Sequence, residues 1–361
     1  MKQPNRCGKI VINDVAKTAQ CSTATVSRVL SNSDYPVSDE LRQRVLDAVQ
    51  KLGYSPNPYG RILRTNINPS IGIIIPSFQN PFFSQIVMGI EHIASKRGYT
   101  PMVFASQRDP SLERKYIRDM MNKRISCLML CSVDDHSDVV EQYIAKGGHA
   151  CVFESNFPPL GSALNASADM FKAAQIATEY LISQGHQQIA FLTPPLSRSS
   201  RHQRVDGCRF AMAMHGLEFG ADDVISVPYE NDVDEGLYEY NIGMVLAKKM
   251  LLHSKQYTAV IALNDLIACG IIAGLVQSGV RVPEDISVVG FDDIPIAMMV
   301  TPQLTTVRLS GYLVGQRATQ MIIDAYESNE SGNQVTLSVA PVLVARNSVA
   351  NLKDVRQSIR I

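Results

Sequence analysis

The first apolar pattern of the chain lies between residues 12 and 31 and predicts two short helices. A tight polar connection, Gln20-Cys21, separates them. Ser22 is a good N-cap for the second helix, because its hydroxyl can accept a hydrogen bond from a backbone N–H. The pair predicts a helix-turn-helix, or else an ordinary helical hairpin with a solvated outer face. The apolar residues recur at helical spacing on one face of each helix: Val15, Ala16 and Ala19, then Val26, Val29 and Leu30.

A third helix is predicted from Ser38, its N-cap, to about Leu52, with Gly53 placed to end it. Its apolar positions recur at helical spacing and would close the core of a three-helix module. The segment after Gly53 contains two prolines, Pro56 and Pro58, which forbid a continuous helix. A short helix could begin at Pro58.

From Ile71 onward the pattern changes, and near-continuous apolar strands alternate with amphipathic helices. Such strands are typical of parallel sheets that are covered on both faces. This part of the chain is too long for one hydrophobic core, so two doubly wound lobes are expected. Strands are predicted at 71–76, 101–106, 126–132, 150–155, 188–194, 224–229, 259–264, 286–293, 304–310 and 341–348, and helices at 83–97, 111–123, 170–184, 204–216, 243–252, 266–278 and 312–327.

Charge is distributed unevenly, although the formal net charge of the chain is zero. Residues 1–66 contain ten Lys and Arg against five Asp and Glu, so the remainder is acidic by the same margin. A basic head on an acidic body fits a small module that contacts phosphates, carried by a body that does not.

Several classes of protein are excluded by what the sequence lacks. The seven cysteines are scattered without a CxxC pair or zinc-finger spacing, so we expect reduced thiols and no metal. There is no P-loop, no placed catalytic triad and no signal peptide, and no apolar run is long enough to cross a membrane. We expect a protein of the cytoplasm that is not an enzyme, needs no cofactor and has no membrane partner.

The residues of the two N-terminal helices resemble the signature of the lactose/galactose-repressor (LacI/GalR) family of bacterial transcription regulators. The match is D-V-A-x-x-A-x-x-S-x-x-T-V-S-R-V-L from Asp14 to Leu30. One departure is the turn, where the family often has Gly-Val and this chain has Gln20-Cys21. Glycine is favoured where the backbone needs a positive φ, so Gln20 would strain the turn there by about 1 kcal/mol.

Segments of the body also resemble this family, from Asn80-Pro81-Phe82-Phe83 to 282–293 and the Thr305-Thr306-Val307 segment. The resemblance implies an α/β fold: an all-α helix-turn-helix module and a periplasmic-binding-protein-like core of two doubly wound parallel-sheet lobes. It implies a homodimer that binds double-stranded operator DNA and a small effector. The expected domains are 1–56 (helix-turn-helix), 57–67 (hinge helix), 68–350 (core, with lobe 1 about 68–165 and 298–328 and lobe 2 about 166–297 and 329–350) and 351–361 (short tail).

For DNA, the resemblance assigns base contacts to Thr23, Ala24 and Arg28, with Thr25 and Ser27 as phosphate or backbone partners. Leu63 matches the family's hinge-helix leucine, an apolar wedge that opens a base step in the minor groove. Pro58, Tyr59 and Gly60 replace the small helix formers that are usual in this hinge, and Gly60 alone costs about 1 kcal/mol of helix stability relative to alanine.

For the effector, the resemblance and the rule that ligands lie beyond the carboxyl ends of parallel strands indicate eight residues. Arg204 stands at the family's effector-binding arginine, Asp292 matches its acidic partner of ligand hydroxyls, and the aromatic residues would stack against a sugar or purine ring. The bland alternatives are a surface charge for Arg204, a turn residue for Asp292 and plain core for the phenylalanines. The eight residues are Ser77, Phe82, Phe83, Glu154, Arg204, Tyr238, Asn264 and Asp292.

The sequence thus predicts a transcription regulator, most simply a repressor, that a cleft ligand controls. We expect a sugar or sugar derivative as effector, with a purine or nucleoside as the alternative; a ligand-binding receptor without a regulatory role is the competing class. The effector would release the protein from DNA or recruit it, depending on which lobe arrangement it binds more tightly.

Overall fold

The computed structural model describes residues 10–30, 35–55, 68–133, 138–153, 163–228, 237–328 and 336–353. The chain divides into two compact units, with the boundary between Asn68 and Pro69. Three expected features lie outside the described residues: the hinge helix with Pro58–Gly60, Leu63, and Glu154.

The described residues of the first unit form three helices: α1 (Ile12–Thr18), α2 (Thr23–Leu30) and α3 (Asp39–Leu52). Its core consists of small and β-branched side chains from all three helices, which lets the short helices approach closely. These residues are Val15, Ala16, Ala19, Val26, Val29, Val45 and Ala48. Ser38 accepts a hydrogen bond from Leu41 N–H at the start of α3, and Gly53 ends α3 with φ 60°. Both were predicted as the helix boundaries.

The turn between α1 and α2 has the strained backbone that its sequence predicts. Gln20 has φ 52°, in the left-handed region where glycine is favoured. Its neighbour Cys21 donates its backbone N–H to Ala16 O at 3.0 Å, so the left-handed residue closes the C-terminal end of α1. Ser22 then caps α2, because its hydroxyl accepts a hydrogen bond from Thr25 N–H at 3.1 Å.

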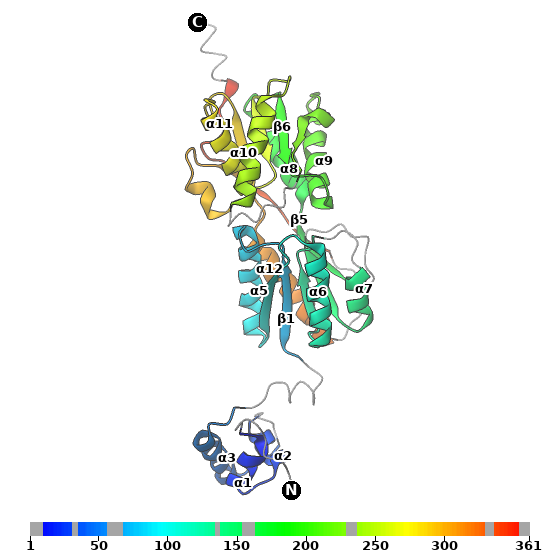
Figure 1. Cartoon of the computed structure of the whole chain (residues 1–361), viewed down its shortest axis with the longest axis vertical. Helices are drawn as coiled ribbons and strands as arrows, with labels where there is room; N and C mark the ends of the chain where they lie inside the picture. Colours follow the sequence, from blue (N-terminus) through cyan, green and yellow to red (C-terminus); the bar gives the residue numbers. More distant parts are fainter. Residues whose placement is uncertain are drawn as a thin grey trace. The chain divides into compact units, whose positions relative to one another are not determined.

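The second unit is built on two six-stranded sheets, each covered by helices (Figure 1). The first sheet is parallel throughout and has the order β11-β5-β4-β3-β1-β2. Its strands are β1 (Ser70–Ile75), β2 (Thr100–Ala105), β3 (Cys127–Leu130), β4 (His149–Phe153), β5 (Leu164–Ala168) and β11 (Thr336–Val339). The helices of this lobe are α5 (Pro81–Lys96), α6 (Pro110–Asn122), α7 (Asp138–Ala145) and α12 (Gly311–Ser328).

The two faces of the first sheet bury alternate residues of the same strands. Ile74 of β1 packs with Ile117 of α6 and Tyr143 of α7 on one face. Ile73 packs on the other face, in the cluster that contains Ile86 of α5. The near-continuous apolar runs of the sequence follow from this two-sided burial.

The second sheet has the order β12-β10-β9-β8-β6-β7 and is parallel except for β12, which runs antiparallel to β10. Its strands are β6 (Ile189–Thr193), β7 (Val224–Ser226), β8 (Ala259–Ala262), β9 (Ser287–Asp292), β10 (Thr305–Arg308) and β12 (Val342–Val344). Its helices pack as two pairs, α8 (Met170–Ser183) with α9 (Ser199–Met214), and α10 (Tyr238–Leu251) with α11 (Asp265–Gln277). Two short 3₁₀ helices, Ala221–Asp223 and Pro295–Met298, complete the lobe.

The expected division into lobes is wrong at two strands. β10 lies within the stretch 298–328 assigned to the first lobe but pairs with β9 in the second sheet, and β11 lies within the stretch 329–350 assigned to the second lobe but pairs with β5 in the first. The chain therefore crosses between the lobes after β5, after β10 and after β11. A buried strand has the same apolar pattern in either sheet, so the pattern alone does not reveal these crossings.

Besides the two 3₁₀ helices, two strands and one α-helix of the second unit were not predicted. β5 has small and polar residues in alternation, and β11 is an exposed edge strand, so neither has the apolar run of a buried strand. Helix α7 has only eight residues. Two predicted helices begin earlier than expected, since α9 starts at Ser199 and α10 at Tyr238. Within the described residues, no helix combines the length and apolar character that a membrane crossing requires.

The strained turn predicts that Gln20→Gly stabilises the first unit. Glycine removes the left-handed penalty of about 1 kcal/mol but adds flexibility to the unfolded chain, so we expect a net gain of roughly 0.5 kcal/mol. Hydrogen exchange of the amides of α1–α3 in the full chain measures this gain. Lys17→Gly, at an exposed position inside α1, is the matched control and should lose about 1 kcal/mol. Slower exchange in the control than in Gln20→Gly would contradict the account.

Candidate functional site

The outer face of α2 has the character expected of a DNA-reading helix. Thr23, Ala24 and Arg28 are exposed, whereas Thr25 and Ser27 are partly buried. The Thr25 hydroxyl lies 2.9 Å from that of Ser22 at the start of the helix. Short uncharged side chains in the first turn would allow close approach to base edges, and Arg28 follows one turn later.

Arg28 contacts an aromatic side chain of the same unit. The centre of its guanidinium lies 3.9 Å from the centroid of the Tyr35 ring. A cation above an aromatic face is favourable and restrains the long arginine side chain. Tyr35 thereby limits the directions in which Arg28 points.

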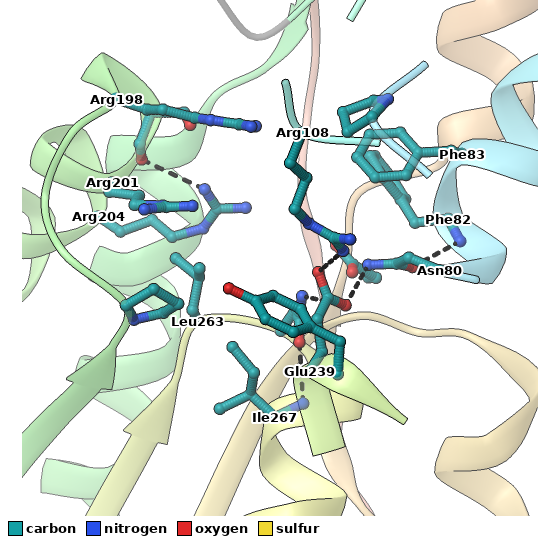
Figure 2. Close-up of a pocket in the computed structure, with 16 residues that line it drawn as sticks. Asn80, Phe82, Phe83, Arg108, Arg198, Arg201, Arg204, Glu239, Leu263 and Ile267 are labelled. Atoms are coloured by element: carbon teal, nitrogen blue, oxygen red, sulfur yellow. Dashed lines mark hydrogen bonds and ion pairs between the residues drawn. The ribbon is translucent and has the colours of Figure 1, made fainter. Parts of the chain in front are cut away.

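The second unit contains a cavity between its two lobes, at the carboxyl ends of the strands (Figure 2). Its lining residues surround about 620 Å³ of empty space, which includes the part open to solvent. The residues that line it come from both lobes: Pro76, Asn80, Phe82, Phe83, Arg108, Pro194, Arg198, Ser200, Arg201, Arg204, Tyr238, Glu239, Leu263, Asn264, Ile267 and Asp292.

The carboxylate of Glu239 connects the two lobes inside this cavity. From the first lobe, Arg108 donates to Glu239 Oε1 at 2.9 Å and Asn80 Nδ2 donates to Oε2 at 3.0 Å. From its own lobe, Asn264 Nδ2 donates to Oε2 at 3.1 Å. The ion pair is mostly shielded, with the side chain of Arg108 21% exposed and that of Glu239 14% exposed. Figure 2 shows Arg108 and Asn80 converging on Glu239.

Two of these partners are fixed by the helices they begin. Asn80 is the N-cap of α5, where its Oδ1 accepts from Phe82 N–H at 2.9 Å. Asn264 is the N-cap of α11, where its Oδ1 accepts from Ile267 N–H at 2.9 Å. Each asparagine caps a helix with its oxygen and reaches Glu239 with its nitrogen, so both halves of the amide are used.

Arg204 is buried at the second-lobe side of the cavity, with only 5% of the residue exposed. Its guanidinium lies 5.3 Å from the Phe291 ring centroid and donates to Ser200 O at 3.2 Å. Gly207, three residues further along α9, lets α9 pack against α8, because a Cβ there would meet Phe171 O at 2.2 Å. Glycine at this position therefore brings Arg204 close to the sheet.

Aromatic rings form the apolar walls. Phe82 and Phe83 at the start of α5 pack edge to face, with centroids 5.9 Å apart. Tyr238 lies at the start of α10, and the Arg108 guanidinium is 4.8 Å from its ring centroid. Such rings can stack against a sugar or base.

Asp292 has an unusual backbone conformation at the end of β9. Its φ is 107°, and Asp293 follows with φ 56°. A strained conformation persists only where the surroundings hold it. Asp293 is held by ion pairs with Arg346 at 2.5 Å and Arg308 at 2.7 Å.

Asp265 holds the next part of this turn. Its carboxylate accepts from Ile294 N–H at 2.9 Å and from the Thr306 hydroxyl at 2.6 Å. Gly290 makes room for it, because a Cβ there would lie 2.3 Å from Asp265 Oδ1. Burial raises the pKa of the Asp265 carboxyl to about 7, although both hydrogen bonds act in the opposite direction.

Six of the eight expected effector residues line this cavity: Phe82, Phe83, Arg204, Tyr238, Asn264 and Asp292. Ser77 does not line it, because its hydroxyl turns back to accept from Gln79 N–H at 3.0 Å in the loop before α5. Glu154 and, for DNA, Leu63 lie outside the described residues.

Sequence reasoning missed the charged residues Arg108, Arg198, Arg201 and Glu239, and did not assign Asn80 to the effector. Arg108 lies three residues after the end of β2, so the strand-end rule could have found it. Glu239 was missed because α10 begins five residues before the expected start.

Other reactive groups have structural partners. His186 lies 3.0 Å from Thr258 Oγ1 and 3.2 Å from Ala350 O, and burial lowers its pKa. Burial raises the pKa of the Cys151 and Cys208 thiols to about 12. Across the described ranges, no three His, Cys, Asp or Glu residues gather as a metal site would require.

Comparison with known proteins covers nearly the whole chain. The model for bacterial regulatory proteins of the lacI family matches residues 11–57, and the model for periplasmic binding proteins and the sugar-binding domain of the LacI family matches residues 68–346. The chain belongs to the LacI family. It combines the family's helix-turn-helix DNA-binding module with its ligand-binding domain.

Relatives that match nearly the whole chain are transcription repressors. The chain is 31% identical over 351 residues to the HTH-type transcriptional repressor PurR of Vibrio campbellii, covering 94% of this chain and 99% of the relative. It is 31% identical over 340 residues to the ribose operon repressor of Escherichia coli K12, covering 93% and 99%. The Lac repressor dimer bound to operator and the anti-inducer ONPF has a TM-score of 0.79 at 26% identity, covering 95% and 99%.

The raised pKa of Asp265 predicts a pH dependence of stability. The ordinary carboxyl pKa is about 4, so folding takes up a proton between about pH 4 and pH 7. The contribution of Asp265 to stability is full below pH 4 and is lost as the pH rises through 7. Urea unfolding at pH 5.5 and pH 8 should therefore show a smaller loss with pH for Asp265→Asn than for the wild type.

Asp285→Asn is the matched control for this experiment. Hydrogen bonds from the Arg281 side chain lower the Asp285 pKa to about 2, so this carboxyl is ionised in both states at pH 5.5 and pH 8. The control should keep the wild-type pH dependence. Equal pH dependence in both variants would show that Asp265 is ionised throughout.

Proposed function

We propose that this protein is a repressor that binds a pseudo-palindromic operator as a homodimer and responds to a small effector in the interlobe cavity. The observation that carries the proposal is Glu239, whose carboxylate is bonded from both lobes inside that cavity. A ligand that competes for these donors, or adds to them, has a different affinity for different lobe arrangements. That difference is what a regulatory ligand requires.

On the DNA side, we propose that Thr23, Ala24 and Arg28 read bases and that Thr25 and Ser27 contact the backbone. The exposure of the first three residues and the partial burial of the other two agree with this division. Leu63 completes the proposal as a minor-groove wedge of the hinge. The described residues of the second unit contain no comparable helix-turn-helix.

For the effector we propose a sugar or sugar derivative. Carboxylates, amides and arginine around an aromatic wall are the groups that bind vicinal hydroxyls. Asn264, Asp292 and Arg204 supply the polar groups, and Phe82 supplies the wall. The resemblance to the ribose operon repressor supports this class.

A purine or nucleoside is the second candidate. The edge-to-face pair Phe82 and Phe83, together with Tyr238, offers flat apolar faces on which a base could stack. The 31% identity to PurR supports this candidate as much as the 31% identity to the ribose operon repressor supports a sugar. Thermal-shift measurements with ribose, adenosine and adenine distinguish the two classes, because a ligand that binds the folded state raises its unfolding temperature.

A homodimer of the cytoplasm completes the proposal. α5 exposes Met88, and the loop before it exposes Phe78. These large apolar side chains would be covered in a dimer. The similarity to the Lac repressor dimer supports this assembly.

We predict that Arg28→Ala reduces sequence preference. Sites selected from random DNA by the full chain supply the specific sequence, and fluorescence anisotropy then compares this site with scrambled DNA. A base contact by arginine contributes about 1–3 kcal/mol of discrimination, so the preference should fall by about tenfold or more. Lys51→Ala, at the far end of α3, is the control. An equal loss of affinity for both DNAs would assign Arg28 to a phosphate instead.

We predict that Arg204→Met abolishes the effector response but leaves operator affinity intact. Methionine keeps an apolar stem against Phe291 and removes the cation. The readout is the change in operator affinity on adding the ligand found by thermal shift. A wild-type response in the variant would remove Arg204 from the effector site.

A further inference from the structure

The cavity has an excess of positive charge on its second-lobe side. Its charged residues are four arginines and two acids. Arg108 and Glu239 neutralise each other through their ion pair. Three arginines, Arg198, Arg201 and Arg204, then face one remaining carboxylate, Asp292. A neutral sugar requires no such excess of cations.

The three arginines lie three residues apart at the start of α9, so they occupy one face of its first turns. Figure 2 shows them on one side of the cavity, across from Arg108, Phe82 and Phe83. Arg201 is as buried as Arg204, each with 5% of its surface exposed, but the Arg201 guanidinium already donates to Pro195 O and Ser197 Oγ. Burying cations costs free energy unless an anion or a full set of acceptors compensates.

Arg204 has a donor that no group in the described residues accepts from. Its Nε atom is fully buried and has no hydrogen-bond partner within the described part of the chain. A buried donor without an acceptor is unfavourable, so a ligand acceptor at this position would be strongly bound. This unpaired donor indicates a ligand, and it is an observation independent of the excess of positive charge.

The N-terminus of α9 adds to the same field. The helix has 16 residues, its N-cap is Arg198 without a side-chain cap bond, and its first turn contains no acid. The positive end of the helix dipole is therefore not compensated by a nearby side chain of the turn itself. An anion at this end would interact with both the dipole and the arginines.

We propose that the effector carries an oxyanion, a phosphate ester or a carboxylate, which binds between Arg198, Arg204 and the start of α9. The hydroxyl-bearing part of the molecule then lies toward Glu239, Asn264 and Asp292, beside the phenylalanines. The inference rests on the proposed function in taking this cavity as the effector site, and it narrows the effector to sugar phosphates and sugar acids.

The test measures the unfolding temperature of the full chain with matched ligand pairs at constant ionic strength. The pairs are ribose 5-phosphate with ribose, glucose 6-phosphate with glucose, and gluconate with glucose; inorganic phosphate against chloride serves as the minimal probe. We expect phosphate to stabilise the chain in a saturable manner, and the charged member of at least one pair to bind about tenfold or more tightly than its neutral partner. The three pairs separate a phosphate ester from a carboxylate.

Arg198→Gln should weaken phosphate binding about tenfold, since it removes one charge-assisted contact. Arg209→Gln is the matched control, because Arg209 lies on the same helix but is exposed and paired with Asp206 at 2.7 Å. Phosphate stabilisation that is absent, or equal in both variants, would overturn the proposal.

Failure of this inference and failure of the proposed function are separate outcomes. A neutral sugar or nucleoside that binds and changes operator affinity, while every anion fails, overturns the oxyanion and leaves the repressor standing. A chain that selects no DNA sequence overturns the repressor, whereas phosphate binding is still measured because the thermal assay contains no DNA.

Discussion

The interaction on which the effector site depends is the set of hydrogen bonds to one carboxylate. Glu239 accepts hydrogen bonds from Arg108 and Asn80 of the first lobe and from Asn264 of the second. Both asparagines are helix N-caps, so their positions are set by α5 and α11 rather than by flexible loops. A contact made by rigid elements responds to any relative displacement of the lobes that carry them. The carboxylate thereby makes the contents of the cavity and the arrangement of the lobes interdependent.

Near this contact, surrounding ion pairs and hydrogen bonds hold a strained backbone and a buried carboxyl in place. Asp292 keeps a left-handed backbone because Asp293 is paired with two arginines and Ile294 N–H is bonded to Asp265. Asp265 in turn is buried far enough for its pKa to rise to about 7. Strain and buried charge of this kind are typical of sites where residues are positioned for a ligand.

Much of the fold follows from the sequence, because periodicity reports burial directly. The two-faced burial of Ile73 and Ile74 produces the apolar runs that predict a covered parallel sheet. Gln20 was expected to strain the turn if it kept the positive φ that favours glycine, and it has φ 52°. The allocation of β10 and β11 to sheets was wrong because strand pairing is a long-range property that local patterns do not contain.

The candidate site was only partly predictable for a similar reason. Strand-end residues such as Asn264 and Asp292 could be found by the rule for parallel sheets, and Arg204 by resemblance. Glu239 belongs to no such pattern, and its ion pair with Arg108 joins two lobes that are far apart in sequence, so local patterns do not reveal it. Ser77 satisfies the strand-end rule but is used by its own loop, because a hydroxyl can bond locally wherever the backbone turns.

The central claim is that Glu239 holds the two lobes together, and a distance measurement tests it without knowledge of the effector. Spin labels on α6 of the first lobe and α9 of the second, at the exposed positions Lys115 and Arg209, report the interlobe distance by pulsed electron paramagnetic resonance. With Glu239 intact, the account predicts one narrow distance distribution, and Glu239→Ala should broaden or shift it. The same narrow distribution in both proteins would contradict the claim that this carboxylate couples the lobes.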